Sequence, residues 1–364
     1  MRIALVIPYN PLEEIGGLEI ATVIHAKELI RLGHKTTIFT KGTSGMIGNV
    51  SIYGYPSFTE LCFSLLYSRE LFDVFHWMEI FPGPGEVELQ GMVSGLLRSA
   101  GKKTILMVAT SGNLSQRGAG CLATPLLKSS MDAYVVSNPD QLSEFAEYGI
   151  VENVHIIGFG VDTSLFKPVN EGEKIRLRKE LNLPPDKVLC LFVGRFVERK
   201  RPDFLLRAWM SLAGLYNRTE LIIVGSGMDQ HDSMEEKVRQ IAMSVSHVDF
   251  RDITRHPEEY YQACDLLLLP SSREGQPNVL MEMMACGNPV IGSDIAGIRE
   301  LLANGVNGLL FSVNDAEGFT KAVERLVDDK TLRRQLGGKA TELIRETKDV
   351  RLVTAQYTKL YGEG

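Results

Sequence analysis

The sequence lacks several features that mark specialised classes of protein. Its five cysteines are odd in number and show no CxxC spacing, so we expect neither a zinc site nor a disulfide framework. No apolar run approaches the roughly 20 residues of a membrane-spanning helix. No charged leader precedes the first apolar segment, so we expect no signal peptide. These absences predict a cytoplasmic protein, with peripheral contact at the inner membrane face as the most that a membrane would contribute.

An excess of basic charge is also missing. The chain has 39 Lys and Arg against 45 Asp and Glu, which gives a net charge of -6. Proteins that bind nucleic acid in general carry a basic surface, so we expect no nucleic-acid partner. With 364 residues the chain exceeds what one hydrophobic core usually spans, and we expect two domains.

One stretch of the C-terminal half, residues 265–300, combines the signals of a strand, a loop, a helix and a second strand. The apolar run from Leu266 to Leu269 is too short for a helix and does not alternate, which predicts a strand buried on both faces. Pro277 follows a polar loop and suits the first position of a helix. We expect that helix to run to about Cys286, with a second short strand from Pro289.

Two carboxylates stand out in this stretch. Glu274 lies in the loop, and Glu282 is the only ionisable side chain of an otherwise apolar helix. A charge in such a place needs a partner or a ligand. The loop also follows a parallel strand, and open α/β sheets bind ligands at that edge, where a helix N-terminus favours phosphate. The alternative is that both residues are solvated surface charges.

A second candidate group follows the strand that we predict from Val188 to Val193. Gly194 and Arg195 come directly after it, with Lys200 five residues further on. An Arg fork and a Lys point charge beyond a parallel strand can neutralise a diphosphate. A basic cluster of this kind is a solvated surface as often as it is a phosphate site.

The N-terminal half offers weaker candidates. Gly16 and Gly17 precede a predicted helix, where paired glycines let a phosphate approach backbone amides or simply form a turn. They do not match the GxGxxG fingerprint, which counts against a nicotinamide-linked dehydrogenase. His76 ends a predicted strand, and an isolated His is more often an ordinary core or surface residue than a functional one.

The stretch EGQPNVLMEMMACGNPVI resembles the E-x7-E signature of the family 4 retaining glycosyltransferases, which have the GT-B fold. The resemblance implies that Glu274 faces the donor sugar and that Glu282 takes the ribose hydroxyls. It implies that Gly275, Asn278 and Val279 supply the amides that hold sugar hydroxyls and phosphate.

Other segments extend the resemblance over nearly the whole chain. Arg195 and Lys200, after Gly194, match the family's donor-phosphate pair, and Gly16 with Gly17 match its glycine pair. His76 is similar to the His of its D-x-x-H segment, near the interdomain cleft. Many members carry a further His where this sequence has Thr110 to Asn113, so the role of that His does not transfer.

The resemblance implies an α/β protein of the GT-B type, with two Rossmann-like, doubly wound parallel-sheet domains facing a cleft. The domains expected are 1–168 on the acceptor side, 169–345 on the nucleotide-sugar donor side, and a C-terminal helix, 346–364, that crosses back to the first domain. Strand and helix signals alternate in both halves, in agreement with two parallel sheets.

The expected function is that of a retaining, metal-independent hexosyltransferase without cofactors. It would move a sugar from a nucleotide-diphosphate sugar to an acceptor hydroxyl on a glycan, a lipid-linked sugar or a small molecule. Arg195 and Lys200 would stabilise the leaving phosphate, and Glu274 would act electrostatically rather than as a nucleophile. The alternatives are an epimerase or phosphorylase of the same fold, or a non-catalytic nucleotide-sugar binding protein.

Overall fold

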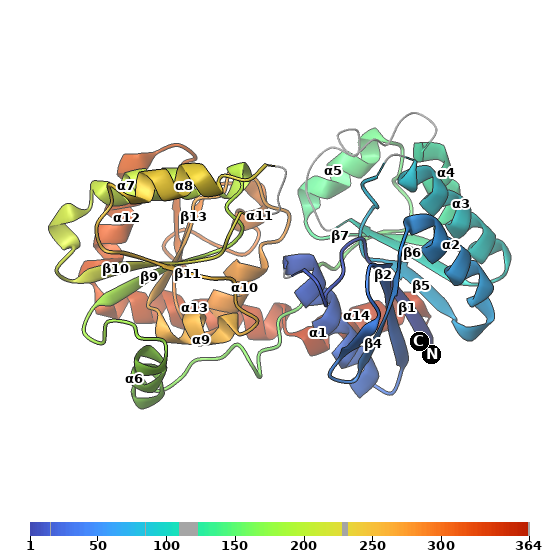
Figure 1. The fold of residues 1–364 in the computed structure, drawn as a ribbon, viewed down its shortest axis with the longest axis horizontal. Coiled ribbons are helices and arrows are strands. Elements are labelled where there is room, and N and C mark those ends of the chain that lie inside the picture. Colours follow the sequence, from blue (N-terminus) through green and yellow to red (C-terminus); the bar gives the residue numbers. More distant parts are fainter. Residues whose placement is uncertain (15, 84, 109–122, 228–231, 363–364) are drawn as a thin grey trace. The chain divides into compact units, whose positions relative to one another are not determined.

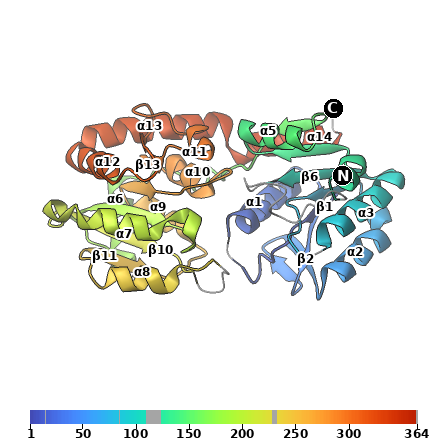
Figure 2. The same cartoon turned by 90° about the horizontal axis from the view of Figure 1, so that it is seen from above.

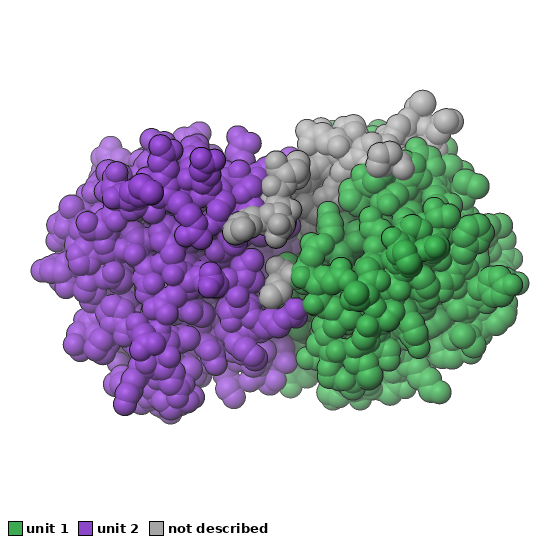
Figure 3. Space-filling model, in the orientation of Figure 1, with its two compact units in different colours: residues 1–160, 350–364 green, residues 161–349 purple. Residues whose placement is uncertain are grey.

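The structure is a computed structural model that describes residues 1–14, 16–83, 85–108, 123–227 and 232–362. These residues form two compact units (Figure 3), one of residues 1–160 with 350–364 and one of residues 161–349. In each unit helices pack on a sheet that is parallel except at one edge strand of the first unit (Figures 1 and 2). Each unit therefore has the α/β layers that the sequence predicted.

The sheet of the first unit contains eight strands in the described residues, in the order β3-β4-β2-β1-β5-β6-β7-β8. All neighbours pair in parallel except β3 with β4. The strands are β1 (Arg2–Val6), β2 (Lys35–Lys41), β3 (Gly45–Ile47), β4 (Val50–Tyr55), β5 (Val74–Trp77), β6 (Lys103–Val108), β7 (Ala133–Val136) and β8 (Val154–Ile156).

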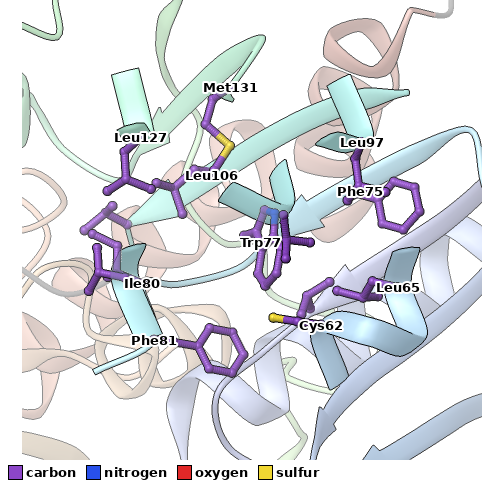
Figure 4. Packing of buried hydrophobic residues seen from close by; sticks show 14 of the residues in the cluster. Cys62, Leu65, Phe75, Trp77, Ile80, Phe81, Leu97, Leu106, Leu127 and Met131 are labelled. Carbon is purple, nitrogen blue, oxygen red and sulfur yellow. The ribbon is translucent and has the colours of Figure 1, made fainter. Parts of the chain in front are cut away.

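Helices cover both faces of this sheet, and the alternation of side chains along β5 shows what each face meets. Phe75 and Trp77 point into a hydrophobic core, which α2, α3, α4 and α5 close (Figure 4). His76 points to the opposite face, where α1 and α14 pack together. The helices are α1 (Gly17–Arg31), α2 (Phe58–Tyr67), η1 (Arg69–Leu71), α3 (Glu86–Ser99), α4 (Ala123–Ser130), α5 (Pro139–Glu147) and α14 (Val350–Tyr361).

The sheet of the second unit has six described strands, all parallel, in the order β11-β10-β9-β12-β13-β14. The chain builds outward from β9 in one direction and from β12 in the other, which is the doubly wound order of a Rossmann fold. The strands are β9 (Val188–Val193), β10 (Thr219–Val224), β11 (Val248–Arg251), β12 (Leu266–Leu269), β13 (Val290–Ser293) and β14 (Leu309–Phe311).

The helices of the second unit separate its sheet from solvent on both sides. The core on one face includes α7, α8 and α12, while α10 packs on α9 and α13. The helices are α6 (Glu171–Glu180), η3 (Glu198–Lys200), α7 (Pro202–Met210), η4 (Ala213–Leu215), α8 (Glu235–Ala242), α9 (Pro257–Ala263), α10 (Asn278–Ala285), α11 (Ala296–Arg299), α12 (Ala316–Asp328) and α13 (Lys330–Thr347).

The segment 161–168 belongs to the second unit, whereas the sequence placed it at the end of the first domain. The ring of Phe166 packs against that of Tyr261 with centroids 5.9 Å apart. Gln262 donates a hydrogen bond to the carbonyl of Leu165, and the amide of Val161 donates one to the carbonyl of Lys348. The partner residues are distant from 161–168 in sequence. The local charge and proline content, from which the boundary was predicted, therefore could not indicate that this segment packs on the second unit.

Candidate functional site

The candidate residues of the second unit gather where β9 and β12 lie side by side. The loop after β9 (194–201) and the loop after β12 (270–277) both leave the carboxyl edge of the sheet. Since β9 and β12 are the strands from which the chain builds in opposite directions, these loops diverge. Such a switch point is where open α/β sheets bind ligands.

At this point the Glu274 carboxylate contacts two cations. Lys200 Nζ lies 2.6 Å from Glu274 Oε1, and an Arg199 guanidinium nitrogen lies 3.2 Å from Glu274 Oε2. The side chains of Glu274 and Lys200 are 6% and 11% exposed. This burial contradicts the alternative in which Glu274 and Lys200 are solvated surface charges.

Burial alone would raise the pKa of Glu274, but the charges of Lys200 and Arg199 outweigh it and hold that pKa below its ordinary value. The pKa of Lys200 is lowered as well, because burial outweighs the attraction of Glu274 and because Arg199 and Arg195 repel its charge. Arg195 follows β9 in the same loop as Lys200. The structure thus brings together the two cations and the carboxylate that the sequence singled out.

Glu282 lies on the buried side of α10, where burial raises its pKa to about 7. The Tyr261 hydroxyl counteracts this shift, Glu258 adds to it, and the charge of Lys200 again lowers the pKa. Lys200 therefore acts on both carboxylates. A carboxyl group with a pKa near neutrality changes its hydrogen-bonding capacity within the physiological range.

The helix α10 begins at Asn278, with Pro277 as its N-cap, one residue later than the sequence predicted. The first amides of a helix have no partner inside it, and the helix dipole favours a negative group there. Gly275, Asn278 and Val279 thus lie at the end of α10 that suits phosphate or a sugar oxygen. That these residues contact the donor stays a prediction.

Two glycines allow the main chain of the site to pack closely. A Cβ at Gly225 would lie 2.0 Å from the carbonyl oxygen of Gly194, and one at Gly297 would lie 2.3 Å from that of Glu274. Gly225 also has a φ of +150°, which disfavours other residues. Both loops therefore need glycine on an adjoining segment.

The basic cluster beside Lys200 does not act as one group. Arg201 stacks on Phe204 at 4.4 Å and donates a hydrogen bond to Asn314. Phe204 lies in the first turn of α7 and Asn314 lies just before α12, so neither contact involves Glu274. Arg199, in contrast, faces Glu274, and sequence reasoning did not assign it a role because its neighbours have the same charge. Tyr261 beside Glu282 was missed as well, since nothing local links α9 to α10.

His76 occupies the interior of the first unit rather than a ligand site. It is fully buried, and its Nδ1 lies 2.8 Å from the Tyr361 hydroxyl. The same hydroxyl lies 3.1 Å from His25 Nε2, and His25 Nδ1 lies 3.0 Å from the Thr354 hydroxyl. These four residues, the histidine cluster, join α1, β5 and α14. The structure corrects the predicted catalytic role of His76, because a substrate cannot reach it.

Both histidines of this cluster are neutral. Burial lowers the pKa of His25 to about 3. Burial and the nearby His25 lower the pKa of His76 well below its ordinary value. The hydroxyls of Thr354 and Tyr361 pair with both ring nitrogens of His25 and with His76 Nδ1, whereas His76 Nε2 has no hydrogen-bond partner among the described residues. Through these contacts the cluster fastens α14 to the first unit.

The remaining predictions in the first unit concern Gly16, Gly17 and the segment Thr110 to Asn113. Gly16 precedes α1 in an extended conformation and Gly17 begins it, as expected. A donor contact from this pair stays a prediction. Thr110 to Asn113 lie outside the described residues.

Two kinds of feature are absent from the described residues. No three His, Cys, Asp or Glu side chains there are grouped so as to hold a metal ion. None of the helices described combines the length and the apolar character that crossing a membrane requires.

Comparison with known proteins relates the site-bearing unit to a family. Residues 173–343 match the family model "Glycosyl transferases group 1". A D-inositol 3-phosphate glycosyltransferase of Corynebacterium aurimucosum is 26% identical over 94% of this chain and 91% of its own length. The D-inositol 3-phosphate glycosyltransferase 2 of Catenulispora acidiphila is 33% identical over 57% of this chain and 51% of its own.

Solved structures show the same fold. HepE of Anabaena, solved with UDP-glucose, has a TM-score of 0.83 at 17% identity and covers 99% of both chains. WaaG, a glycosyltransferase involved in lipopolysaccharide biosynthesis, has a TM-score of 0.76 at 17% identity, and the match covers 100% of both chains. The GT-B fold that the sequence predicted is confirmed.

Proposed function

We propose that this chain, whose residues 173–343 match the group 1 glycosyltransferases, transfers a sugar from a nucleotide-diphosphate sugar to an acceptor hydroxyl, with retention of configuration. The observation that carries the proposal is the convergence of Glu274, Lys200 and Glu282 at the switch point of the second unit. A carboxylate beside a buried cation suits a ligand that has hydroxyl groups at one end and a diphosphate at the other.

The donor is proposed to lie across the loops after β9 and β12. Its diphosphate is bound by Arg195, Lys200 and the amides at the start of α10, and its ribose hydroxyls by Glu282. The sugar lies beside Glu274. The charges of Arg195 and Lys200 favour the anion that forms as the phosphate leaves, so they stabilise the transition state more than the bound donor. This assignment requires no metal ion.

We assign Glu274 an electrostatic and positioning role rather than that of a nucleophile. Its two oxygens lie within ion-pair distance of Lys200 and Arg199, which reduces their availability to form a covalent bond. Retention then follows if the acceptor oxygen attacks from the face that the phosphate leaves. In that step the bond from the anomeric carbon to the phosphate oxygen breaks, and the phosphate accepts the acceptor's proton.

The relatives suggest acceptor classes without deciding among them. Two of the proteins similar to this chain are named for inositol 3-phosphate, and WaaG for lipopolysaccharide biosynthesis. We propose a polyol, glycan or lipid-linked acceptor, met in the cytoplasm or at the inner membrane face.

A thermal-shift screen of UDP-, GDP- and ADP-sugars tests the donor. A ligand at a hundred times its dissociation constant stabilises the folded protein by about 2.7 kcal/mol. Glu282→Ala should weaken donor binding, whereas Arg195→Ala should mainly lower turnover. If both variants kept wild-type donor affinity and turnover, the site assignment would be wrong.

The products separate this function from its alternatives. A transferase releases nucleoside diphosphate faster when an acceptor is added. An epimerase converts the donor without any acceptor, and a binding protein shifts the melting temperature but forms no product with any acceptor.

A further inference from the structure

Glu274 has one more ionic partner than the proposed function uses. Lys200 contacts Oε1 at 2.6 Å, and Arg199 contacts Oε2 at 3.2 Å. The Arg199 side chain is 25% exposed, so most of it is buried where it contacts Glu274. A buried carboxylate with a separate cation on each oxygen is held in one orientation, because a rotation of the group would lengthen both contacts.

The main chain of Arg199 holds the same loop. Its carbonyl oxygen accepts hydrogen bonds from the amide of Ser272, at 2.8 Å, and from the Ser272 hydroxyl, at 3.3 Å. Arg199 therefore binds the loop after β12 through its backbone and the carboxylate of that loop through its side chain. On another side the loop meets Gly297, where no Cβ would fit. The position of Glu274 is thus fixed by contacts that do not involve Lys200.

These contacts from Arg199 and Gly297 matter because Lys200 has two partners in the proposed function, Glu274 and the donor diphosphate. In the proposed function the ammonium group of Lys200 binds the donor diphosphate. Its ion pair with Glu274 Oε1 is then either weakened or broken. A buried carboxylate that loses its only cation takes up a proton more readily. Arg199 remains on Oε2 in either case, and a guanidinium keeps its charge at any physiological pH.

We propose that Arg199 is a positioning residue that keeps Glu274 ionised and directed at the donor sugar while Lys200 binds the diphosphate. This inference rests on the proposed function. The inference gives Arg199 a different role from that of Arg195 and Lys200. Arg199 should support recognition of the sugar, whereas Arg195 and Lys200 bind the phosphates.

Calorimetric titration with a nucleoside diphosphate and the matching sugar nucleotide tests the assignment. The ligand pairs are UDP with UDP-glucose, GDP with GDP-mannose and ADP with ADP-glucose, and the pair that binds the wild type is used. Arg199→Ala should leave the affinity for the diphosphate within about twofold, and should lower that for the sugar nucleotide roughly tenfold or more. Arg199→Lys should recover part of the lost affinity, since lysine restores the positive charge but not the planar, two-pronged geometry of the guanidinium.

The pH dependence supplies a readout that a merely structural role would not move. The loss in Arg199→Ala should be larger at about pH 5 than at about pH 7.5, because Glu274 without Arg199 is protonated at a higher pH. The matched control is Arg218→Ala, which breaks an exposed ion pair with Asp328 in the same unit. It should change neither affinity.

Each other result overturns a specific statement. An equal loss for both ligands would make Arg199 a phosphate ligand, and no loss for the sugar nucleotide would make its contact with Glu274 incidental. A wild-type protein that binds none of the ligand pairs would refute the proposed function itself. A melting temperature in Arg199→Ala close to that of the control would show that the variant folds, and Arg199→Lys serves if it does not.

Discussion

Each unit of this protein contains a buried polar cluster, and the two clusters differ in charge. In the first unit the histidine cluster of His25, His76, Thr354 and Tyr361 is neutral. In the second unit Glu274 and Lys200 form a buried ion pair beside Arg199. The first cluster lies between helices and a sheet face, whereas the second lies at the carboxyl ends of two strands.

The difference shows what distinguishes a structural polar cluster from a candidate site. Neutral groups that are largely hydrogen-bonded to one another cost less to bury than charges do, so they can fasten a helix. Buried charges are costly even when paired, and replacing such pairs with apolar residues is often neutral or stabilising. A charged cluster at a switch point therefore favours a ligand-binding role, while burial of a His does not. Four predictions test this comparison.

The largest effect should come from breaking the ion pair. Lys200→Ala leaves Glu274 buried with one cation fewer, and we expect a loss of roughly 3–5 kcal/mol in the free energy of unfolding of the second unit. Urea unfolding measures it. Adding Glu274→Gln should restore part of the loss because the remaining side chain is uncharged. The exposed pair of Arg218 and Asp328 is the control, and Arg218→Ala should cost at most about 1 kcal/mol. Equal losses in both variants would remove the contrast between the clusters.

The pH dependence of stability should have opposite signs in the two units. The pKa of His25 falls from 6.5 to about 3 on folding, so its contribution is complete above pH 6.5 and is lost as the pH falls toward 3. The pKa of Glu282 rises from 4.5 to about 7, so its contribution is complete below pH 4.5 and is lost as the pH rises through 7. Between about pH 7 and 5, each group should contribute roughly 2 kcal/mol, in opposite directions.

Hydrogen exchange, followed separately for peptides of each unit at the two pH values, measures this divergence. Glu282→Gln should abolish the dependence that Glu282 gives the second unit and leave that of the first unit unchanged. If peptides of α14 were as well protected at pH 5 as at pH 7, the neutral state of the histidine cluster would not be what holds that helix.

Crowding the loop that carries Glu274 should have a moderate effect confined to the second unit. In Gly297→Ala the new Cβ would lie 2.3 Å from the carbonyl oxygen of Glu274, so the loop must shift. We expect a loss of about 1–3 kcal/mol and weaker donor binding, measured by urea unfolding and calorimetry. Gly338→Ala on α13 is the control, since a Cβ there meets open space. A Gly297→Ala variant with wild-type donor affinity would show that the site does not need this close packing.

The smallest effect should come from removing one hydrogen bond of the histidine cluster. Thr354→Val deletes the hydroxyl that lies 3.0 Å from His25 Nδ1, which should cost about 1 kcal/mol in the first unit. Donor affinity should not change. Thr347→Val, at an exposed hydroxyl on α13, is the control and should be nearly neutral. A fall in donor affinity in Thr354→Val would contradict the purely structural role of the cluster.

Much of the local structure could be predicted from sequence because its causes are local. The run Leu266–Leu269 is a fully buried strand, as predicted, and α10 begins at Asn278, one residue after the predicted start at Pro277. The apolar character of α10 around Glu282 correctly indicated a buried carboxylate. These features depend on periodicity, on chain stiffness at proline and on the composition of a few neighbouring residues.

The partners of the candidate residues could not be predicted in the same way. Arg199 and Arg201 are two positions apart in a basic cluster, yet one contacts Glu274 and the other stacks on Phe204. The left-handed conformation at Arg201, with φ of 55°, redirects the chain between them. His76 matched a family segment but faces α14, which comes from the far end of the chain.

The sequence by itself determined the strands, the helices and the chemistry available at the end of β12, because these follow from the order of neighbouring residues. Only the tertiary structure decided that β9 lies beside β12, and hence that Arg199 and Lys200 meet a carboxylate more than 70 residues away. The physical reason is that strand order results from the packing of the whole unit, and a charge acquires its partner only when that order brings two loops together.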